Sequence, residues 1–297
     1  MKITLPEICQ NYSNLLQQFS AEIQTNLAKK GALVSEKYAF KLEAANFEYW
    51  QNIDSTQLRA KQLAHTQLIN LIIARCQTKG RGRFGRRFFS PLGGLYFTFT
   101  LPLVADLNRL LYTPLLAVSL QQSLATIVKR SCQIKWVNDL YFQKKKVAGI
   151  ITECVTDKDK SYLVCGVGVN WQAPIGVEVP DLIANRVGNL KLNKEPVTSR
   201  EHAYLSPLQI DVLKEFFQNL ANWQLAYTLG TADFMAVYEE NMLAKNEHVQ
   251  LSNGASVKLI GVDHQDGGLI VLQGEKQLKI TSGELSLLID DKQGVNW

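Results

Sequence analysis

Glycines and arginines alternate in one short stretch of the sequence, which runs Gly-Arg-Gly-Arg-Phe-Gly-Arg-Arg from residue 80 to residue 87. Glycine lets the backbone adopt left-handed conformations and come close to a ligand, so a regular helix or strand is not expected here. Arginine presents a planar set of donors that fits the oxygens of a phosphate or carboxylate two at a time. Such a loop can fold around an anion. The alternatives are a flexible basic surface loop and an RNA-binding segment of the arginine–glycine type, since charge runs usually face solvent.

Three further polar clusters could contribute groups to the same site. Asp54-Ser55-Thr56 precedes a predicted helix, Asn138-Asp139 ends a predicted strand, and Lys146 follows a charged turn. Each also has a purely structural interpretation. Ser55 and Thr56 suit the capping of a helix N-terminus, Asn138-Asp139 suits a turn at the end of a strand, and Lys146 could be a solvated lysine like its neighbours. The order of the surrounding elements has to decide between these interpretations.

The elements that would position these residues follow from hydrophobic periodicity and turn residues. Strands are predicted around residues 47–53, 71–74, 95–100, 133–137, 140–142, 147–154 and 162–170, and helices at 58–68, 112–129, 207–227 and 232–243. An irregular excursion with a short helix near 181–185 follows residue 171, where Pro174, Pro180 and Pro196 interrupt the chain. From residue 247 short strands broken by turns such as Asn253-Gly254 predict a small barrel or sandwich of about 45 residues.

The N-terminal segment has a different pattern of apolar residues. Apolar residues recur every three or four positions between residues 5 and 30, which predicts one or two amphipathic helices that end at Gly31. Short strands follow up to residue 45. This order is similar to the second half of a winged helix, but the segment is short for the complete motif.

Composition limits the class of protein. A chain of 297 residues with 46 % hydrophobic and 20 % charged residues has the balance of a folded protein of two domains, or of one large domain with an appendage. The net charge of +5 favours anionic ligands but does not require nucleic acid. The five cysteines are dispersed without a C-x-x-C pair, so we expect reduced thiols and no metal site.

The N-terminal residues lack the apolar core of a signal peptide, and no apolar run approaches the roughly 18 residues that would span a bilayer. The sequence therefore predicts a soluble, cytoplasmic protein with no membrane contact.

The polar clusters occur in an order and at a spacing that resemble the biotin–protein ligases, also called biotin–[acetyl-CoA-carboxylase] ligases. The resemblance covers roughly residues 47–290 and rests on these pieces: Asp54-Ser55-Thr56, Gln77 with Gly80 to Arg86, Lys135-Trp136-Val137-Asn138-Asp139, Lys146-Val147-Ala148-Gly149-Ile150, Gly166-Val167-Gly168-Val169-Asn170 and Ser282-Gly283-Glu284-Leu285-Ser286. Each piece is short, but the complete set in this order is specific.

The resemblance implies an α/β (α+β) fold. A catalytic domain similar to class II aminoacyl-tRNA synthetases, with a mixed sheet flanked by helices, would occupy residues 46–245. A small SH3-like β-barrel would follow at 246–297, and residues 1–45 would be a truncated winged-helix-like segment.

The resemblance also implies a two-step reaction. The carboxylate of biotin attacks the α-phosphorus of ATP, with Mg²⁺ assisting, to give biotinyl-5′-AMP and pyrophosphate. A lysine of the biotin carboxyl carrier protein domain of acetyl-CoA carboxylase then attacks this mixed anhydride and releases AMP. The first step brings a carboxylate against a triphosphate, so it requires fixed cations aimed at both groups. The neutral ureido ring of biotin requires paired donors and acceptors in an otherwise apolar slot.

The family motifs assign roles to individual residues. The catalytic cations would be Lys146 and Arg81. Biotin would contact Ser55, Thr56, Gln57, Gln77, Arg81, Gly82, Arg83, Lys146 and Gly149. ATP and the adenylate would contact Arg83, Arg86, Phe88, Asn138, Asp139 and Asn170, and Asp139 would bind Mg²⁺.

Three positions depart from the family pattern. Phe88 stands where tryptophan is usual, and because it offers less stacking area and no indole donor, we expect weaker retention of the adenylate. Val137 replaces a frequent proline, and Gln57 replaces the usual asparagine after Ser-Thr, so the family role transfers less directly to Gln57.

Two alternative functions stay open at this point. A lipoate–protein ligase-like acyltransferase shares the fold and the adenylate chemistry, although Gly80 to Arg86 and Trp136 to Asp139 favour biotin. A bifunctional ligase and transcriptional repressor of biotin synthesis would require DNA binding. DNA affinity depends on Lys and Arg at phosphates, and the segment from Asn11 to Leu27 contains neither, so DNA binding is not expected. Family members commonly dimerise through a strand of the catalytic domain, so a homodimer is a further prediction, with the edge strand not identified.

Overall fold

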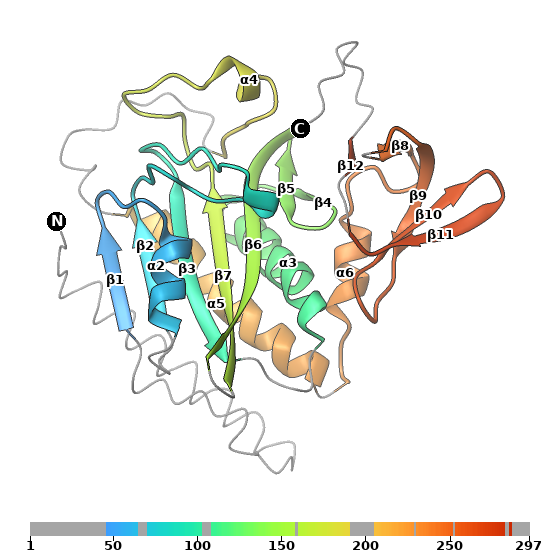
Figure 1. Ribbon diagram of the computed structural model, residues 1–297, viewed down its shortest axis with the longest axis horizontal. Helices are drawn as coiled ribbons and strands as arrows, with labels where there is room; N and C mark the ends of the chain where they lie inside the picture. The colour runs from blue at the N-terminus through green and yellow to red at the C-terminus, as the bar shows by residue number, and fades with distance from the viewer. Residues whose placement is uncertain are drawn as a thin grey trace.

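The computed structural model describes residues 46–64, 70–102, 108–157, 160–190, 205–228, 230–251, 253–282 and 285–286 (Figure 1). The predictions for residues 1–45, including the winged-helix-like segment, lie outside these ranges. The described residues form a large mixed sheet with helices on its faces and a smaller second sheet beside it (Figure 1).

The large sheet has seven strands in the order β1-β2-β3-β7-β6-β5-β4. Their bounds are β1 Asn46–Trp50, β2 Asn70–Ala74, β3 Leu95–Pro102, β4 Gln133–Lys135, β5 Asp139–Phe142, β6 Lys145–Asp157 and β7 Lys160–Val169. Strands β1 and β2 run parallel, and the other named neighbours run antiparallel. The predicted mixed sheet flanked by helices is therefore confirmed.

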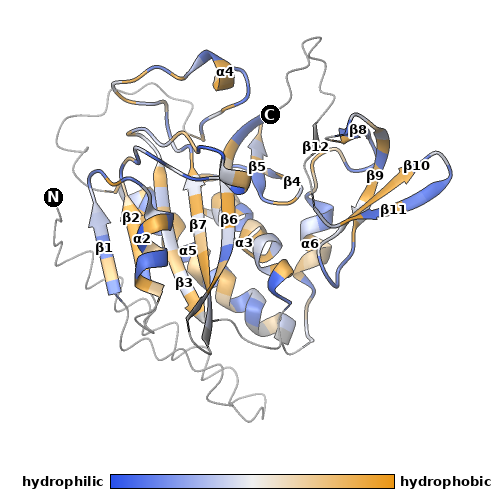
Figure 2. Cartoon of the chain, in the orientation of Figure 1, coloured by the Kyte–Doolittle hydropathy of each residue, from blue (hydrophilic) through white to orange (hydrophobic). Residues whose placement is uncertain are grey.

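Two long helices cover one face of this sheet, α3 (Tyr112–Ser123) and α5 (Pro207–Thr228) (Figure 1). Between strand and helix lies an aromatic cluster in which Phe97 and Phe99 of β3 contact Phe216 and Phe217 of α5, with ring centroids 5.1 to 6.2 Å apart. Most of these contacts are edge-to-face, the arrangement that the charge distribution of aromatic rings favours. In Figure 2 long stretches of β3 and β7 have the orange colour of hydrophobic residues.

Helix α3 is continuous with short helical turns on both sides, and the whole run spans Arg109–Val128. By length and composition alone this run could cross a membrane, but 72 % of its most apolar window is buried inside the protein. Its hydropathy is thus explained by its place beneath the sheet, since a helix that is apolar all round belongs in a core.

Helix α2 (Thr56–Leu63) covers part of the opposite face and begins at Ser55, whose hydroxyl accepts a hydrogen bond from the backbone N–H of Leu58 at 3.4 Å. The helix is fixed to β1 by Arg59, which donates two hydrogen bonds, of 2.7 and 2.8 Å, to the carboxylate of Glu48. Glu48 is only 2 % exposed, so this bidentate pair is directional as well as charged. It sets the position of the first turn of α2, which carries Thr56 and Gln57.

The smaller sheet is antiparallel, in the order β11-β10-β9-β8-β12. Its strands are β8 His248–Leu251, β9 Ser256–Val262, β10 Leu269–Gln273, β11 Lys276–Ile280 and β12 Leu285–Ser286. The short strands predicted from residue 247 onward are thus present. Apolar residues of β8, β9 and β10 pack into the same core as the large sheet, whereas β11 is hydrophilic (Figure 2).

Helices α4 (Asp181–Ala184) and α6 (Phe234–Glu240) complete the described fold. Helix α4 lies in the predicted excursion after β7, and α6 is shorter than the predicted range 232–243 because the chain turns after Asn241 and bridges Met242 to Ile134 beside β4. This bridge holds the chain at the end of α6 beside β4, the edge strand of the large sheet.

Trp136 links the two sheets, because its indole Nε1–H donates to the backbone oxygen of Gly267 at 2.9 Å and the side chain is 5 % exposed. We expect Trp136→Phe to lower the free energy of unfolding by about 1–3 kcal/mol, because it leaves a buried carbonyl without its donor. Urea denaturation measures this change. Trp223→Phe is the matched control, since Trp223 donates to Gln122 at 2.7 Å from a half-buried position. An equal or larger loss in the control would contradict the proposed importance of the Trp136 bond.

Candidate active site

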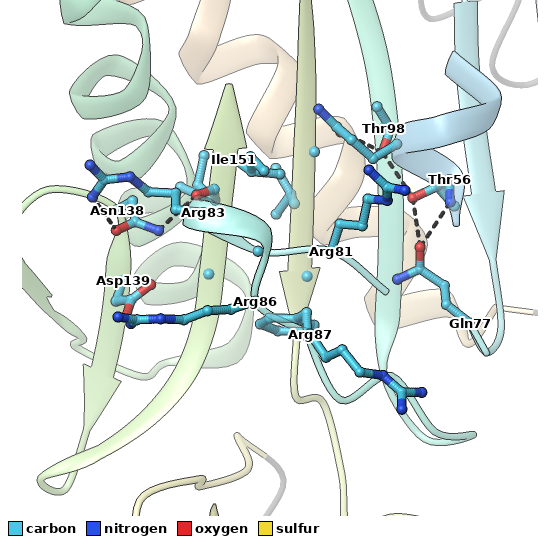
Figure 3. A pocket seen from close by; sticks show the side chains of 18 of the residues that line it. Thr56, Gln77, Arg81, Arg83, Arg86, Arg87, Thr98, Asn138, Asp139 and Ile151 are labelled. Carbon is cyan, nitrogen blue, oxygen red and sulfur yellow. Dashed lines mark hydrogen bonds between the residues drawn. The ribbon is translucent and has the colours of Figure 1, made fainter. Parts of the chain in front are cut away.

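A pocket lies between the glycine–arginine loop and the strands β6 and β7 (Figure 3). It is lined by Thr56, Gln57, Gln77, Arg81, Gly82, Arg83, Arg86, Arg87, Phe88, Thr98, Asn138, Asp139, Lys146, Gly149, Ile150, Ile151, Gly166, Val167 and Gly168. These residues come from α2, the loop, and strands β3, β5, β6 and β7. The structure thus brings together most of the residues that the sequence motifs singled out.

Two of the predicted site residues do not line the pocket. Ser55 is fully buried and caps α2, as the structural interpretation of this residue predicts. Asn170 lies just after β7, and its side-chain amide donates to the backbone oxygen of Lys146 at 3.2 Å. Both residues therefore hold the chain around the pocket in this structure, Ser55 through α2 and Asn170 through β6.

The end of the pocket at Thr56 and Gln77, termed the closed end, is lined by polar side chains, and in Figure 3 Arg81 extends toward it. Gln77 accepts two hydrogen bonds through Oε1, one from the backbone N–H of Thr56 at 2.8 Å and one from the Thr56 hydroxyl at 3.1 Å. The hydroxyl of Thr98 donates in turn to Thr56 Oγ1 at 2.8 Å. On the other side Gln77 Nε2 donates to Ser90 Oγ at 3.0 Å. These bonds fix the orientation of the Gln77 amide, which can still offer one N–H to a ligand.

The middle of the pocket is formed by Phe88 lying on a floor of glycines. A Cβ atom on Gly168 would come within 2.5 Å of the Phe88 ring, and one on Gly149 within 3.0 Å. Phe88 also meets Tyr96 edge-to-face at 6.4 Å, and the ammonium of Lys146 lies 5.8 Å from its ring centroid. These two glycines are cross-strand partners in β6 and β7, and together they make room for one aromatic ring.

The open end of the pocket is charged. Lys146 Nζ lies 2.7 Å from Asp139 Oδ2, and Arg83 donates to Asn138 Oδ1 at 3.3 Å (Figure 3). Asn138 is itself held by a bond from its Nδ2 to the backbone oxygen of Ile150 at 2.8 Å. Asp139 Oδ1 is buried without a hydrogen-bond partner among the residues that the structure describes. A buried carboxylate oxygen in this position is suited to accept a ligand group.

Tyr238 of α6 lies behind this end of the pocket and is fully buried. Burial raises the pKa of the Tyr238 phenol well above its usual value, and the negative charge of Asp139 raises it further, while Arg83 lowers it. The phenol therefore stays protonated beside the carboxylate, and α6 contributes to the electrostatics of the pocket.

The backbone of Lys146 is fixed from three directions. Its N–H donates to Arg186 O at 2.8 Å, and its carbonyl accepts from Gly188 N at 2.9 Å as well as from the Asn170 amide. The excursion after β7 therefore returns to β6 beside the lysine. These bonds fix the position of the Lys146 backbone, although the four-carbon stem of the side chain remains flexible.

The loop folds back on itself over the pocket. Gly82 N donates to Arg86 O at 2.8 Å, and Phe88 N donates to Gly80 O at 2.9 Å, so the arginines lie at the bend of a narrow turn. Gly80 has no room for a side chain, because a Cβ atom there would lie 2.4 Å from Phe88 O. In Figure 3 Arg83 and Arg86 extend toward Asn138 and Asp139, and Arg87 points to the opposite side, where it donates to Thr78 O at 2.7 Å.

Some lining residues were missed by the sequence analysis: Arg87, Thr98, Ile150, Ile151, Gly166, Val167 and Gly168. Gly166 and Gly168 were noticed only as part of a motif. Their alternation within a strand is itself a signal, because glycine in a strand often marks the close approach of another chain or a ligand. Thr98 carried no such signal, since threonine is common in strands.

No group of three or more His, Cys, Asp or Glu side chains in the described ranges could hold a metal ion. Histidine is also absent from the pocket lining; His264 pairs with Asp233 at 2.5 Å near the smaller sheet, and His65 and His202 fall outside the described residues. Asp139 is the carboxylate of the pocket lining.

Residues 49–170 match the model of the biotin/lipoate A/B protein ligase family. The chain is 32 % identical over 154 residues to the bifunctional ligase/repressor BirA of Bacillus spizizenii, an alignment that covers 48 % of this chain and 47 % of that protein. The matched segment thus spans about half the length of this curated relative.

Two biotin protein ligases are among the solved structures that resemble this fold. The biotin protein ligase of Aquifex aeolicus in complex with biotin and ATP is 33 % identical, with a TM-score of 0.63, and the match covers 82 % of this chain and 98 % of that one. The biotin protein ligase of Leishmania major in complex with biotinyl-5-AMP matches with a TM-score of 0.50 at 19 % identity, a likeness of fold alone.

Proposed function

Since this chain belongs to the biotin–protein ligase family, we propose that it activates biotin with ATP and transfers the biotinyl group to a lysine of a carrier protein. The observation that carries the proposal is one pocket with hydrogen-bonded polar groups at Thr56 and Gln77, an aromatic ring on glycines in the middle, and the charged pair of Lys146 and Asp139 at the other end. Biotin has the same sequence of groups, a neutral ureido ring, an apolar ring and chain, and a carboxylate.

In this proposal the ureido ring lies at the closed end, where Thr56 and Gln77 offer a hydroxyl and an amide held in fixed orientations. The apolar part of biotin lies against Phe88 and the glycine floor. Paired polar groups inside an apolar slot are what a neutral cyclic urea needs in order to replace its bonds to water.

The carboxylate would then lie among the cations at the open end. One of its oxygens attacks the α-phosphorus of ATP, a new phosphorus–oxygen bond forms, and the bond to the β-phosphate breaks to release pyrophosphate. Lys146 and Arg81 would stabilise the charge near the carboxylate and the α-phosphate, and Arg83 and Arg86 would face the other phosphates. Fixed cations that meet developing charge usually contribute more to catalysis than any other single effect.

In the second step the neutral amine of the acceptor lysine attacks the carbonyl of the mixed anhydride. The carbon–oxygen bond to the phosphate breaks, AMP leaves, the attacking nitrogen releases one proton to water, and an amide remains on the carrier. The same cations would stabilise the departing phosphate.

The pocket also suits Mg²⁺. Asp139 Oδ1 is a buried carboxylate oxygen without a partner in the described part of the chain, and Mg²⁺ in nucleotide sites is usually held by one or two carboxylates together with phosphates. We propose that Asp139 is this ligand. Magnesium bound there would neutralise charge on the phosphates.

We further propose that the acceptor is the biotin carboxyl carrier protein domain of acetyl-CoA carboxylase and that the enzyme works in the cytoplasm. The domain division proposed is catalytic for residues 46–245 and SH3-like for 246–297, supported by a five-stranded antiparallel sheet in the second range. A homodimer would form by pairing of an edge strand, and the described edges of the large sheet are β1 and β4.

Two alternatives have specific support. The family model includes lipoate ligases, so lipoate has to be tested as the acid. The Bacillus relative is named a bifunctional ligase/repressor, so DNA containing the promoter of the biotin operon has to be tested as a ligand.

Mass spectrometry of the purified protein with ATP, Mg²⁺ and a carrier domain tests the proposal directly. We expect one biotinyl group on one carrier lysine with biotin, and no adduct with lipoate. An adduct only with lipoate would support the first alternative, and nanomolar, salt-sensitive operator binding would support the second.

Phe88 offers a sharper test of the pocket. We expect Phe88→Trp to slow dissociation of biotinyl-adenylate by about twofold to tenfold, because a larger aromatic face adds about 0.5–1.5 kcal/mol of stacking. Stopped-flow fluorescence measures the rate. Phe84→Trp is the matched control, since Phe84 lies on the same loop but is 64 % exposed. An off-rate unchanged by Phe88→Trp would contradict the proposed contact between residue 88 and biotinyl-adenylate.

A further inference from the structure

The amide of Gln57 is held from outside the pocket. Its Nε2 donates to Glu153 Oε2 at 2.9 Å and to the backbone oxygen of Val164 at 3.1 Å. A carboxylate and a backbone carbonyl can only accept hydrogen bonds, so both N–H groups of Gln57 point away from the pocket. The side chain is 3 % exposed. Reversing the amide would place its oxygen against two oxygens, and neither of them could donate a hydrogen bond.

This orientation directs the carbonyl oxygen of Gln57 toward the closed end of the pocket. Oε1 lies directly above Gly166, where a Cβ atom would come within 2.4 Å of it. Thr98 Oγ1 is 3.3 Å away, but its single proton has a shorter partner in Thr56 Oγ1 at 2.8 Å. An amide oxygen has two lone pairs, so Gln57 presents a fixed acceptor to the pocket.

Glu153 is positioned in turn by Lys61. The Lys61 ammonium lies 2.5 Å from Glu153 Oε1, while the other carboxylate oxygen accepts from Gln57. Gln57 and Lys61 are four residues apart on α2 and so share one face of the helix. One carboxylate of β6 thereby bridges two side chains of α2, and Glu153 also lines a second cavity together with the glycine–arginine loop.

We propose that Glu153 is a specificity-determining positioning residue, which makes Gln57 an acceptor for an N–H group of the ligand. The proposal rests on the proposed function, under which that N–H belongs to the ureido ring of biotin. The dithiolane ring of lipoate has no such donor and would leave Gln57 Oε1 with only the 3.3 Å contact to Thr98 Oγ1. A site built to bond a polar group rejects the analogue that lacks it more strongly than a hydrophobic site rejects a change of size.

The test compares Glu153→Met, which keeps the length of the side chain but has no acceptor, with Glu153→Gln, which keeps one. We expect Glu153→Met to raise KM for biotin by about tenfold, the usual effect of losing a hydrogen bond to a charged group, with kcat and KM for ATP within about twofold. Glu153→Gln should recover most of the loss. Glu275→Met, at an exposed position between β10 and β11, removes the same charge and should behave like the wild type.

A second readout connects residue 153 to the ligand. Biotin methylated at a ureido nitrogen lacks one N–H, and the wild type should bind at least one of the two N-methyl analogues about tenfold more weakly than biotin. In Glu153→Met this penalty should shrink, because the acceptor orientation is no longer fixed. A role in folding alone would leave the penalty unchanged.

The outcomes separate the two proposals. If the wild type activates biotin and Glu153→Met leaves KM for biotin unchanged, or raises KM for ATP equally, the role of Glu153 is wrong and the ligase function stands. An unchanged N-methyl penalty also overturns it. If the wild type neither binds nor activates biotin, the proposed function itself fails.

Discussion

Replacing Lys146 with methionine is expected to slow formation of biotinyl-adenylate by a factor of about 10² to 10³, the usual effect of losing one preorganised charge-stabilising group. Methionine keeps the apolar stem against Phe88 but leaves Asp139 without its cation, which now lies 2.7 Å away. The net charge at the open end then becomes less favourable to a carboxylate and a triphosphate. Because the effect falls on charge that develops during the reaction, kcat should fall more than KM for biotin rises.

Release of pyrophosphate under saturating biotin and ATP measures this rate. Lys145→Met is the matched control, since Lys145 is the preceding residue of β6 and is exposed, and it should keep nearly full activity. Lys146→Arg should be intermediate, because the charge remains but the guanidinium is broader and differently hydrated. A loss below tenfold in Lys146→Met would mean that the arginines of the loop supply the needed charge without it.

The elements of the fold could be predicted from local pattern, but their arrangement could not. Alternation identified β3 and periodicity identified α5, because each element turns one face or stripe to the core. Strand β7 pairs with β6 in a hairpin, but its place beside β3 depends on pairings between residues 60 or more positions apart, such as Leu95 with Val169. No local pattern in a sequence specifies such partners, so strand order came only from the structure.

The residues of the pocket also divide into those that could be predicted from the sequence and those that only the structure reveals. Residues on loops and element ends, such as Arg81 and Lys146, were found because their motifs are contiguous in sequence. Thr98 and Gly168 belong to the pocket only because their strands are adjacent and turn one face to it. The bond between Gln57 and Glu153 joins residues 96 positions apart and is visible only after α2 is placed on β6.

Motifs also do not distinguish residues that touch a ligand from residues that hold the chain. Ser55 and Asn170 both belong to motifs, yet Ser55 caps α2 and Asn170 bonds to the backbone of Lys146. A motif marks positions where geometry matters, and an N-cap or a side-chain bond to a strand serves that purpose as well as a contact does. The coordinates show the second role for Ser55 and Asn170, and a ligand contact of either residue stays a prediction.

Replacing Gly168 with alanine is expected to lower kcat/KM for biotin by about tenfold to a hundredfold, because overpacking a close contact costs about 1–3 kcal/mol. The added methyl group would lie 2.5, 2.8 and 3.1 Å from three atoms of the Phe88 ring. The backbone of Gly168 is in ordinary strand conformation, so the cost is steric and falls on the ring. Phe88 must then leave the glycine floor and move into the space proposed for biotin.

A second substitution tests whether the ring is the cause. Phe88→Leu removes the atoms that the methyl group would meet, so Gly168→Ala should cost little when it is added to Phe88→Leu. The interaction energy between the two sites follows from kcat/KM of the wild type, the two single variants and the double variant. Independent, additive losses would show that Gly168→Ala acts through the strand instead, and the glycine of β7 would then have no part in shaping the pocket around Phe88.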